Sequence, residues 1–472
     1  MTKLKYFLWL KEKWQVFIVL SILNISICSA QKQTSDSVMI RRIYNMALTN
    51  GKCYHHLERL CKEAPARLSG SANADKAVEL TFDMLRNIEP DTVWLQPVMV
   101  PHWVRGTKAT CNTINTATPH QFNILALGGS VPTPSGGIKS EVIEINSIKE
   151  LDALGESRIK GKIVFFNRAL DKRIIDTFES YGGCADQRLY GADEASKYGA
   201  VGVLVRSLTL HEDEHPHTGM LIYKTEQRIP SAAISARDAN TLSALLKKNK
   251  VMLDMEMDCR SLPDKQSYNV IAEIKGSEYP DEIILVGGHL DSWDNSEGAH
   301  DDGAGCVHSI EVLSLFKKLD YKPRRTIRCV LFMNEENGSK GARLYADEAK
   351  RKGEKHLVGI ESDRGGFSPH GFTVDGDDEE RKACLKTLQK WRHLFKPYLV
   401  HLFEYGGSGV DVSKLKGQGV ALLGFIPDSQ RYFDYHHAST DNFVNVNRRE
   451  LEMGSATITA LVYLFDQYGL NP

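Results

Sequence analysis

Apolar runs alternate with amphipathic stretches in the second half of the chain. Five short apolar runs have the length of buried strands: residues 270–274, 283–286, 327–333, 357–360 and 421–425. Apolar residues recur at helical spacing in four further stretches: 304–319, 339–350, 379–394 and 447–468. Asn447 is placed to cap the last of these helices and Gly469 to end it. This alternation predicts a mostly parallel sheet with helices on both faces.

The pattern before residue 265 is different. Helical spacing at 39–60 and 74–88 is followed by a strand at 93–100, which Pro101 closes. Glycine- and proline-rich loops then separate short β-like runs, and one helix lies among them: runs at 141–145, 162–166, 201–205 and 232–234, helix at 191–198. We therefore expect a small β-rich lobe at 119–264, inserted between the N-terminal part (31–118) and the main part (265–472) of a larger domain.

Residues 1–30 have the layout of a signal peptide. Four lysines within the first 13 residues precede an apolar stretch at 16–23, and Cys28-Ser29-Ala30 offers small residues for cleavage. The stretch is too short and too polar for a comfortable membrane span. We expect an exported protein, periplasmic or secreted, without a stable membrane span after signal removal. The alternative is a protein anchored in the membrane by an uncleaved N-terminal segment.

Composition narrows the class of protein. A hydrophobic content of 42% and a charged content of 25% are typical of a soluble globular protein. The formal net charge of −1 gives no overall basic surface, so we expect no nucleic-acid partner. Beyond residue 30, the cysteines are scattered without CxxC pairs. That distribution argues against a disulfide scaffold and leaves the pairing of any single bridge open.

Histidines and carboxylates follow four of the apolar runs, each at the carboxyl end of a predicted strand. They are His289, Asp291 and Asp301, then Glu335 and Glu336, then Glu361 and Asp363, and finally His436, His437 and Asp441. In a parallel sheet all of these ends lie at one edge, where ligands of open α/β sheets bind. Two histidines with several carboxylates suit a pair of divalent cations, zinc above all.

The needs of such a centre suggest roles for individual side chains. Two metals need a carboxylate that bridges them, terminal ligands, and a further carboxylate that takes a proton from water. The adjacent Glu335 and Glu336 can divide the last two tasks. Asp291, two residues after His289, can accept the other ring N–H of that histidine and fix its tautomer. Another histidine-rich stretch, HEDEHPHTG, lies at 211–219. We interpret it as a loop that is solvated or faces a neighbouring lobe, in preference to a metal site.

Five segments, in order and spacing, resemble a known family. HLDSWD, GAHDDGAG, NEENGSKGA, ESDRGGF and YFDYHHASTD are similar to the co-catalytic zinc exopeptidases of the plasma glutamate carboxypeptidase (carboxypeptidase Q) type. The earlier RLSGS and VPHWVRG are also similar, and the match covers nearly the whole chain after the signal. The resemblance implies a three-layer αβα zinc-peptidase domain with a mixed, mostly parallel sheet, and it makes the inserted lobe a protease-associated domain.

The resemblance also implies a ligand set for two Zn²⁺ per chain. His289 and Asp363 would bind one zinc, Glu336 and His437 the other, and Asp301 would bridge both. The peptide bond after Asp301 would be cis, as in relatives.

Further roles follow from the resemblance. Glu335 would be the general base and then the acid that protonates the leaving amine. His437 is preferred to His436 because relatives have His, three residues, then Asp or Glu, which here gives Asp441. The loop with Gly407 and Ser408 resembles the family's glycine-rich loop near the substrate pocket, which His436 would also adjoin.

The function implied is zinc-dependent hydrolysis of dipeptides or short peptides by an exopeptidase, with an activated water as nucleophile. Two alternatives stay open: a single-zinc acyl transferase of the glutaminyl cyclase type, and a non-catalytic, receptor-like binding protein on the same fold. The sequence leaves open which end of the peptide is recognised, which side chains are preferred, whether a propeptide is removed, and the oligomeric state. Relatives of this type often form homodimers.

Overall fold

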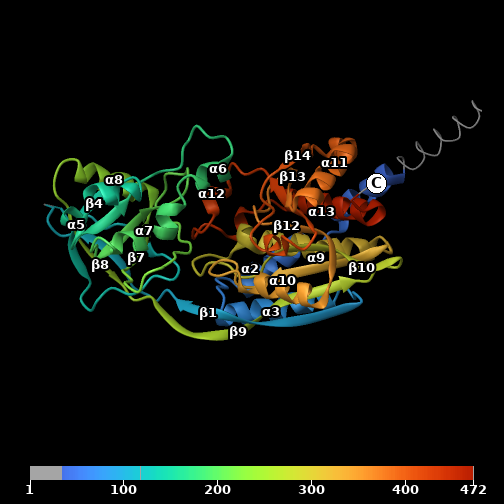
Figure 1. Ribbon diagram of the computed structural model, residues 1–472, viewed down its shortest axis with the longest axis horizontal. Helices are drawn as coiled ribbons and strands as arrows, with labels where there is room; N and C mark the ends of the chain where they lie inside the picture. Colours follow the sequence, from blue (N-terminus) through green and yellow to red (C-terminus); the bar gives the residue numbers. More distant parts are fainter. Residues whose placement is uncertain (1–34, 117, 471–472) are drawn as a thin grey trace, which may run out of the picture.

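The computed structural model describes residues 35–116 and 118–470, which fold around two β-sheets. Figure 1 shows an elongated molecule with one sheet and its helices at each end. Two long strands, β1 (Thr92–Val104) and β9 (Arg260–Ile274), run along one side from the larger lobe toward the smaller. The smaller lobe lies between these strands in the sequence and is therefore an insert. The predicted signal peptide and its alternative, an uncleaved anchor, fall outside the described residues.

The larger sheet has eight strands in the order β1-β9-β11-β10-β12-β15-β13-β14. Besides β1 and β9 these are β10 (Tyr279–His289), β11 (Arg325–Phe332), β12 (Lys355–Glu361), β13 (Pro369–Gly376), β14 (Leu402–Tyr405) and β15 (Ala421–Pro427). The neighbours β11, β10, β12 and β15 are parallel, whereas β9 and β13 pair antiparallel with β11 and β15. The mixed, mostly parallel sheet is confirmed, and its four central strands end at one edge.

Helices cover both faces of this sheet, which confirms the three-layer αβα arrangement. One face carries a helix at residues 35–50 and five more: α2 (Cys53–Glu63), α3 (Ala72–Arg86), α9 (Ala304–Lys318), α11 (Asp378–Phe395) and α13 (Arg448–Tyr468). The other face carries α10 (Lys340–Lys352) and the turn η3 (Val412–Leu415). In β10, Ile284 and Val286 belong to the first core and Leu285 to the second, so the apolar run is buried on both sides.

The smaller sheet has seven strands in the order β2-β8-β4-β5-β6-β7-β3. The strands are β2 (Ala109–Thr113), β3 (Ile124–Ala126), β4 (Ile138–Ile145), β5 (Ile163–Phe166), β6 (Gly202–Arg206), β7 (Ser231–Ile234) and β8 (Met252–Met257). The helices are α4 (Lys149–Leu154), α5 (Glu156–Ile159), α6 (Thr177–Gly182), α7 (Asp186–Ser196) and α8 (Ala236–Leu246). The lobe thus contains more helix than expected. Its sheet begins before residue 119, because β2 pairs antiparallel with β8.

Two early elements differ from prediction. The helix expected at 39–60 is two helices, because the chain breaks at Gly51, where a Cβ would lie 2.3 Å from the Ala47 carbonyl oxygen. The strand expected to close at Pro101 continues to Val104 through a register shift between Val100 and His102. β1 is an edge strand of the larger sheet, and edge strands tolerate proline because one side of the backbone needs no ladder partner.

The cysteines beyond residue 30 are buried, and no two of these described cysteines form a disulfide with each other. Burial in apolar surroundings is the ordinary environment of a free cysteine. Of the helices in the described part of the chain, none is long and apolar enough to cross a membrane.

Candidate metal centre

The four central strands bring the predicted histidines and carboxylates to one edge of the larger sheet. His289 is the last residue of β10, and Glu335 and Glu336 follow the end of β11. Asp363 follows β12 by two residues. The loop after β15 leads through the short helix α12 (Tyr432–Tyr435) to His436 and His437. These segments are far apart in sequence, and the parallel register of the strands brings them together.

Asp301 lies between two imidazoles. Its Oδ1 atom is 3.2 Å from Nε2 of His289, and its Oδ2 atom is 3.4 Å from Nε2 of His437. Asp301 sits at a kink with non-helical backbone angles in the segment η1 (Ala299–Gly303) ahead of α9, and its peptide bond to Asp302 is cis, as the resemblance implied. The backbone N–H groups of His300 and Asp301 donate to the Asp441 carboxylate at 2.7 and 3.1 Å, which holds the turn in place.

His289 presents one ring nitrogen to the centre and uses the other as a donor. Nε2 lies 3.5 Å from Oδ1 of Asp363 and 4.0 Å from Oε2 of Glu335. Nδ1 lies 2.9 Å from the backbone carbonyl of Asp291 and donates its proton there. Asp291 therefore accepts the ring N–H through its backbone carbonyl and not through its carboxylate, whose Oδ1 atom is 3.9 Å from Nδ1.

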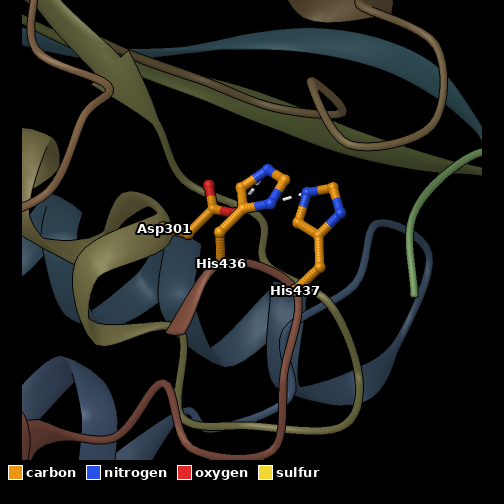
Figure 2. Close-up of side chains that lie close together, drawn as sticks. All are labelled: Asp301, His436 and His437. Carbon is orange, nitrogen blue, oxygen red and sulfur yellow. Dashed lines mark ion pairs between the residues drawn. The ribbon is translucent and has the colours of Figure 1, made fainter. Parts of the chain in front are cut away.

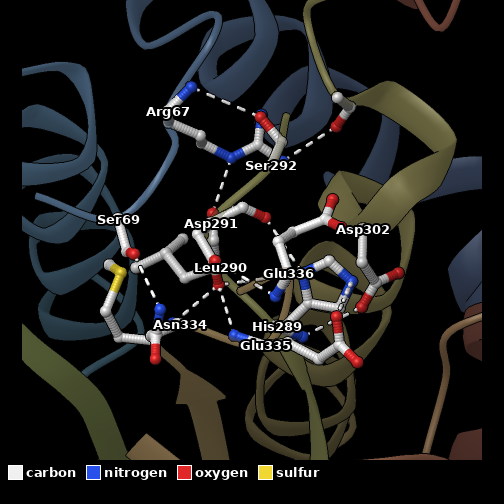
Figure 3. Close-up of polar contacts among 12 residues, drawn as sticks. Arg67, Ser69, His289, Leu290, Asp291, Ser292, Asp302, Asn334, Glu335 and Glu336 are labelled. Carbon is white, nitrogen blue, oxygen red and sulfur yellow. Dashed lines mark hydrogen bonds and ion pairs between the residues drawn. The ribbon is translucent and has the colours of Figure 1, made fainter. Parts of the chain in front are cut away.

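The Asp291 carboxylate instead positions the two glutamates (Figure 3). Its Oδ1 atom accepts the backbone N–H groups of Asn334 and Glu335 at 2.7 and 3.0 Å, and its Oδ2 atom accepts the backbone N–H of Glu336 at 3.4 Å. The fully buried Arg67 fixes the neighbouring loop by donating to the carbonyls of Leu290, Glu297 and Gly298. The RLSGS motif contains Arg67, but the sequence did not indicate that it anchors this loop.

His437 has the same arrangement as His289. Nε2 lies 3.3 Å from Oε2 of Glu336, and Nδ1 lies 3.1 Å from the backbone carbonyl of Thr218 in the smaller lobe. His436 stacks on His437 with ring centroids 3.5 Å apart (Figure 2). Its Nε2 atom is 3.9 Å from Oδ2 of Asp301, and its Nδ1 atom has no hydrogen-bond partner in the part of the chain that the structure describes. His437 is therefore the closer of the two to the centre.

The buried carboxylates at this site favour the binding of cations. Burial raises the pKa of Glu335 to about 8 and that of Glu336 well above its ordinary value. Several carboxylates in one buried place repel each other unless positive charge compensates them. For Asp301, burial acts in the same direction, but the hydrogen bond from His289 and the charge of His437 lower its pKa overall.

The donor set fits metal ions. Oδ2 of Asp301 and Oε1 of Glu336 are buried and have no hydrogen-bond partner among the described residues. Nε2 of His289 faces the other Asp301 oxygen, and Nε2 of His437 faces Oδ2 of Asp301 and Oε2 of Glu336. Two ligands of a tetrahedral zinc, each about 2.0–2.1 Å from the ion, lie about 3.3 Å apart. The contacts between the side chains of Asp301, His289, Asp363, Glu336 and His437 span 3.2–3.5 Å. Asp302 is also close, but its two oxygens accept the backbone N–H groups of His289 and Gly305.

A cavity of about 340 Å³ opens onto these side chains. Of the predicted pocket residues, His436 lines this cavity, whereas Gly407 lines a neighbouring one of about 560 Å³. Ser408 is 1% exposed and lines neither. Another residue of the glycine-rich loop, Val410, reaches the first cavity instead.

The smaller lobe forms one wall of the first cavity, which the sequence did not reveal. Its contributions are Phe178, Tyr181, Arg188, Leu189 and Met220. The histidine-rich loop faces the larger lobe, as favoured: Nδ1 of His217 donates to the His436 carbonyl at 2.7 Å, and Nδ1 of His215 is 3.0 Å from Oγ of Ser439. Figure 1 shows the corresponding approach of α6 to α12 between the lobes.

Fold and site together define an α/β protein built to hold divalent cations at the carboxyl edge of its central sheet. A family model described as peptidase family M28 matches residues 269–462. Carboxypeptidase Q of Bos taurus is 33% identical over 91% of this chain and 88% of its own length, and that of Mus musculus is 34% identical over 90% and 88%.

Solved structures agree. A peptidase M28 precursor from Shewanella amazonensis superposes with a TM-score of 0.87 at 32% identity, covering 93% of this chain and 97% of its own. A zinc aminopeptidase from Bacillus subtilis shares the fold, with a TM-score of 0.64 at 19% identity, covering 88% of this chain and 95% of its own. The chain belongs to peptidase family M28, with carboxypeptidase Q among its relatives, and is a metallopeptidase.

Proposed function

We propose that this protein is a zinc-dependent exopeptidase that hydrolyses dipeptides or short peptides and holds two Zn²⁺ per chain. His289 and Asp363 would hold one ion, Glu336 and His437 the other, and Asp301 would be shared. The observation that carries the proposal is the position of Asp301, with one carboxylate oxygen facing each imidazole at 3.2 and 3.4 Å. The description of the Bacillus structure as a zinc aminopeptidase supports zinc as the metal.

The chain's own groups define the rest of the reaction. Zinc in such a centre polarises a carbonyl group and lowers the pKa of water to about 7. Glu335 lines the cavity and is 4.0 Å from His289, so we assign it the transfer of the proton from water to the leaving amine. Asp291 acts by fixing the backbone of Glu335 and Glu336 rather than by touching the substrate.

Short peptides are the proposed substrates because the smaller lobe closes one side of the cavity. The wall that includes Phe178 and Tyr181 stands opposite the metal ligands and leaves about 340 Å³. A long or folded chain would have to displace this wall, whereas a dipeptide or the end of a peptide would not.

Zinc stoichiometry and hydrolysis of small peptides test this function together. Two zinc ions per chain and chelator-sensitive cleavage of dipeptides are expected. Glu335→Gln should keep both ions and lose about 10²–10⁴-fold in rate. One zinc per chain without cleavage would favour the cyclase-type alternative, and no zinc would favour the binding protein.

Four further expectations remain predictions. They are export through a signal peptide at 1–30, a homodimer, a division of the chain at residues 118 and 264, and a protease-associated domain between these two boundaries. Electrophoretic and mass analysis of the exported protein and light scattering would test the first two. Limited proteolysis would test the domain boundaries.

A further inference from the structure

The smaller lobe places a buried arginine in the cavity of the metal centre. Arg188 lies on α7, lines the cavity with Glu336 and His437, and is only 7% exposed. A buried cation is costly unless an anion faces it. Within the described residues, no carboxylate oxygen of an aspartate or glutamate lies within 4.0 Å of its guanidinium nitrogens, and its Nε atom has no hydrogen-bond partner.

The groups nearest to Arg188 are not carboxylates: its guanidinium contacts the ring of His437 and the side chain of Tyr181. Nη1 lies 3.3 Å from Nδ1 of His437, and the guanidinium carbon lies 5.4 Å from the centroid of the Tyr181 ring. Nδ1 of His437 faces the Thr218 carbonyl at 3.1 Å and donates to it when Nε2 is the free nitrogen. In that tautomer Nδ1 cannot accept a hydrogen bond from Arg188.

We propose that Arg188 binds the free C-terminal carboxylate of the peptide substrate. This inference rests on the proposed peptidase function and narrows it to substrates with a free C-terminus. A guanidinium holds a carboxylate through two parallel hydrogen bonds, which would satisfy the charge and the free donors of Arg188 together.

Chain length places this carboxylate in the same cavity. One residue spans about 3.5 Å, so a single residue beyond the scissile bond keeps its carboxylate close to the metal ligands. The substrates are therefore dipeptides, or peptides that lose one residue from the C-terminus. Amidation of that terminus removes the negative charge and one acceptor oxygen.

Arg364 offers a matched control. It follows Asp363 but lines the neighbouring cavity of about 560 Å³, where Nη2 is 3.4 Å from the Gly407 carbonyl and the guanidinium is 4.8 Å from the Phe178 ring. Phe178 lines both cavities and stands between the two sites. Arg364 therefore serves a different region from Arg188.

The kinetic test compares a dipeptide with its C-amidated form. The zinc-loaded wild-type enzyme should prefer the free acid. Arg188→Gln should lower kcat/KM for the free acid by about 100-fold and change that for the amide less than threefold. Arg364→Gln should keep the wild-type preference. Equal losses on both substrates in Arg188→Gln, or loss of the preference in Arg364→Gln, would overturn the proposal.

A binding measurement separates this proposal from the proposed function. Calorimetry with Glu335→Gln protein should show tighter binding of the free dipeptide than of its amide, and adding Arg188→Gln should abolish the difference. Zinc content is measured in each variant to show that the centre is intact. If wild-type enzyme cleaves neither peptide, the proposed function fails, and the calorimetric preference still decides whether Arg188 binds the carboxylate.

Discussion

The backbone carbonyl of Thr218 lies 3.1 Å from Nδ1 of His437, although 219 residues separate the two along the chain. The contact joins the smaller lobe to the edge of the larger sheet. A partner that accepts the outer ring proton of a metal-binding histidine fixes its tautomer and orientation. The insert therefore contributes to the candidate metal centre as well as to the cavity wall.

Gly219→Ala tests this contact. A Cβ at Gly219 would lie 2.7 Å from Nδ1 of His437 and 2.6 Å from the Arg188 guanidinium, and the φ of +133° disfavours any side chain. We expect zinc affinity to fall by about 10–100-fold, as for other changes next to a metal ligand, with a matching loss of activity. Gly182→Ala is the control, since a Cβ there meets no atom within 4 Å. Equal zinc titrations for the two variants would contradict the coupling.

His436→Gln and His437→Gln identify the metal-binding histidine. Nε2 of His437 contacts both Asp301 and Glu336, whereas that of His436 is 3.9 Å from Asp301. Elemental analysis should find one zinc lost in His437→Gln and both zinc ions kept in His436→Gln. The reverse result would assign the ligand to His436.

Asp291→Asn should impair catalysis without removing zinc. The change replaces one acceptor oxygen by an NH₂ group, so the side chain can no longer accept both the backbone N–H groups of Asn334 and Glu335 on one atom and that of Glu336 on the other. We expect a loss of about 1–3 kcal/mol in unfolding free energy and about 10–100-fold in kcat, measured by denaturation and steady-state kinetics. The matched change Asp294→Asn, at a carboxylate that pairs with Arg105 outside the cavity, should leave kcat nearly unchanged. Full activity in Asp291→Asn would refute the positioning role.

Metal-free protein should lose stability as the pH rises. Burial raises the pKa of Glu335 and Glu361 to about 8, whereas both titrate near ~4.3 in an unfolded chain. Their contribution to stability is fully present below about pH 4.3 and is lost as the pH rises through 8. Burial lowers the pKa of His437, so this histidine reduces the unfolding free energy only below about pH 6.5, where the unfolded chain is protonated. The effect of the two glutamates is therefore measured above that pH.

The corresponding measurement is the Tm between pH 6.5 and 8.5, with and without zinc. The Tm of the chelator-treated protein should fall over this range, and zinc should reduce the fall because cations stabilise the ionised carboxylates. Zinc at about 100 times its Kd adds about 2.7 kcal/mol to the unfolding free energy. Superimposed Tm curves in zinc and in chelator would show that the cluster does not bind the metal.

Much of this centre could be predicted because parallel strands turn sequence order into spatial order. Knowing that apolar runs end at His289, Glu335, Asp363 and the loop to His437 was enough to place all four at one edge. The resemblance added the cis peptide bond after Asp301, which the structure confirms. The N-cap of α13 was also predicted correctly, since Oδ1 of Asn447 accepts two backbone N–H groups of the first turn.

Other features depend on packing that local pattern does not encode. The sequence places Asp291 beside His289 but cannot tell that the carbonyl, rather than the carboxylate, faces Nδ1. β13 and β14 went unpredicted because their runs are short and interrupted by polar residues or glycine. The contacts of Arg188 and Thr218 join segments more than 200 residues apart and follow from how the two lobes dock.

The docking of the two lobes bears on how relatives of this chain are compared. The family model covers residues 269–462, which include every ligand proposed here but exclude Arg188 and Thr218. A homologue that matches this core alone, with a different insert or none, would share the reaction chemistry. Its counterpart of His437 would need another acceptor for the ring N–H that Thr218 accepts here, and its cavity would have a different shape. Because the insert supplies part of the cavity wall, we expect substrate preference to depend on it and to be comparable only among proteins that retain both lobes.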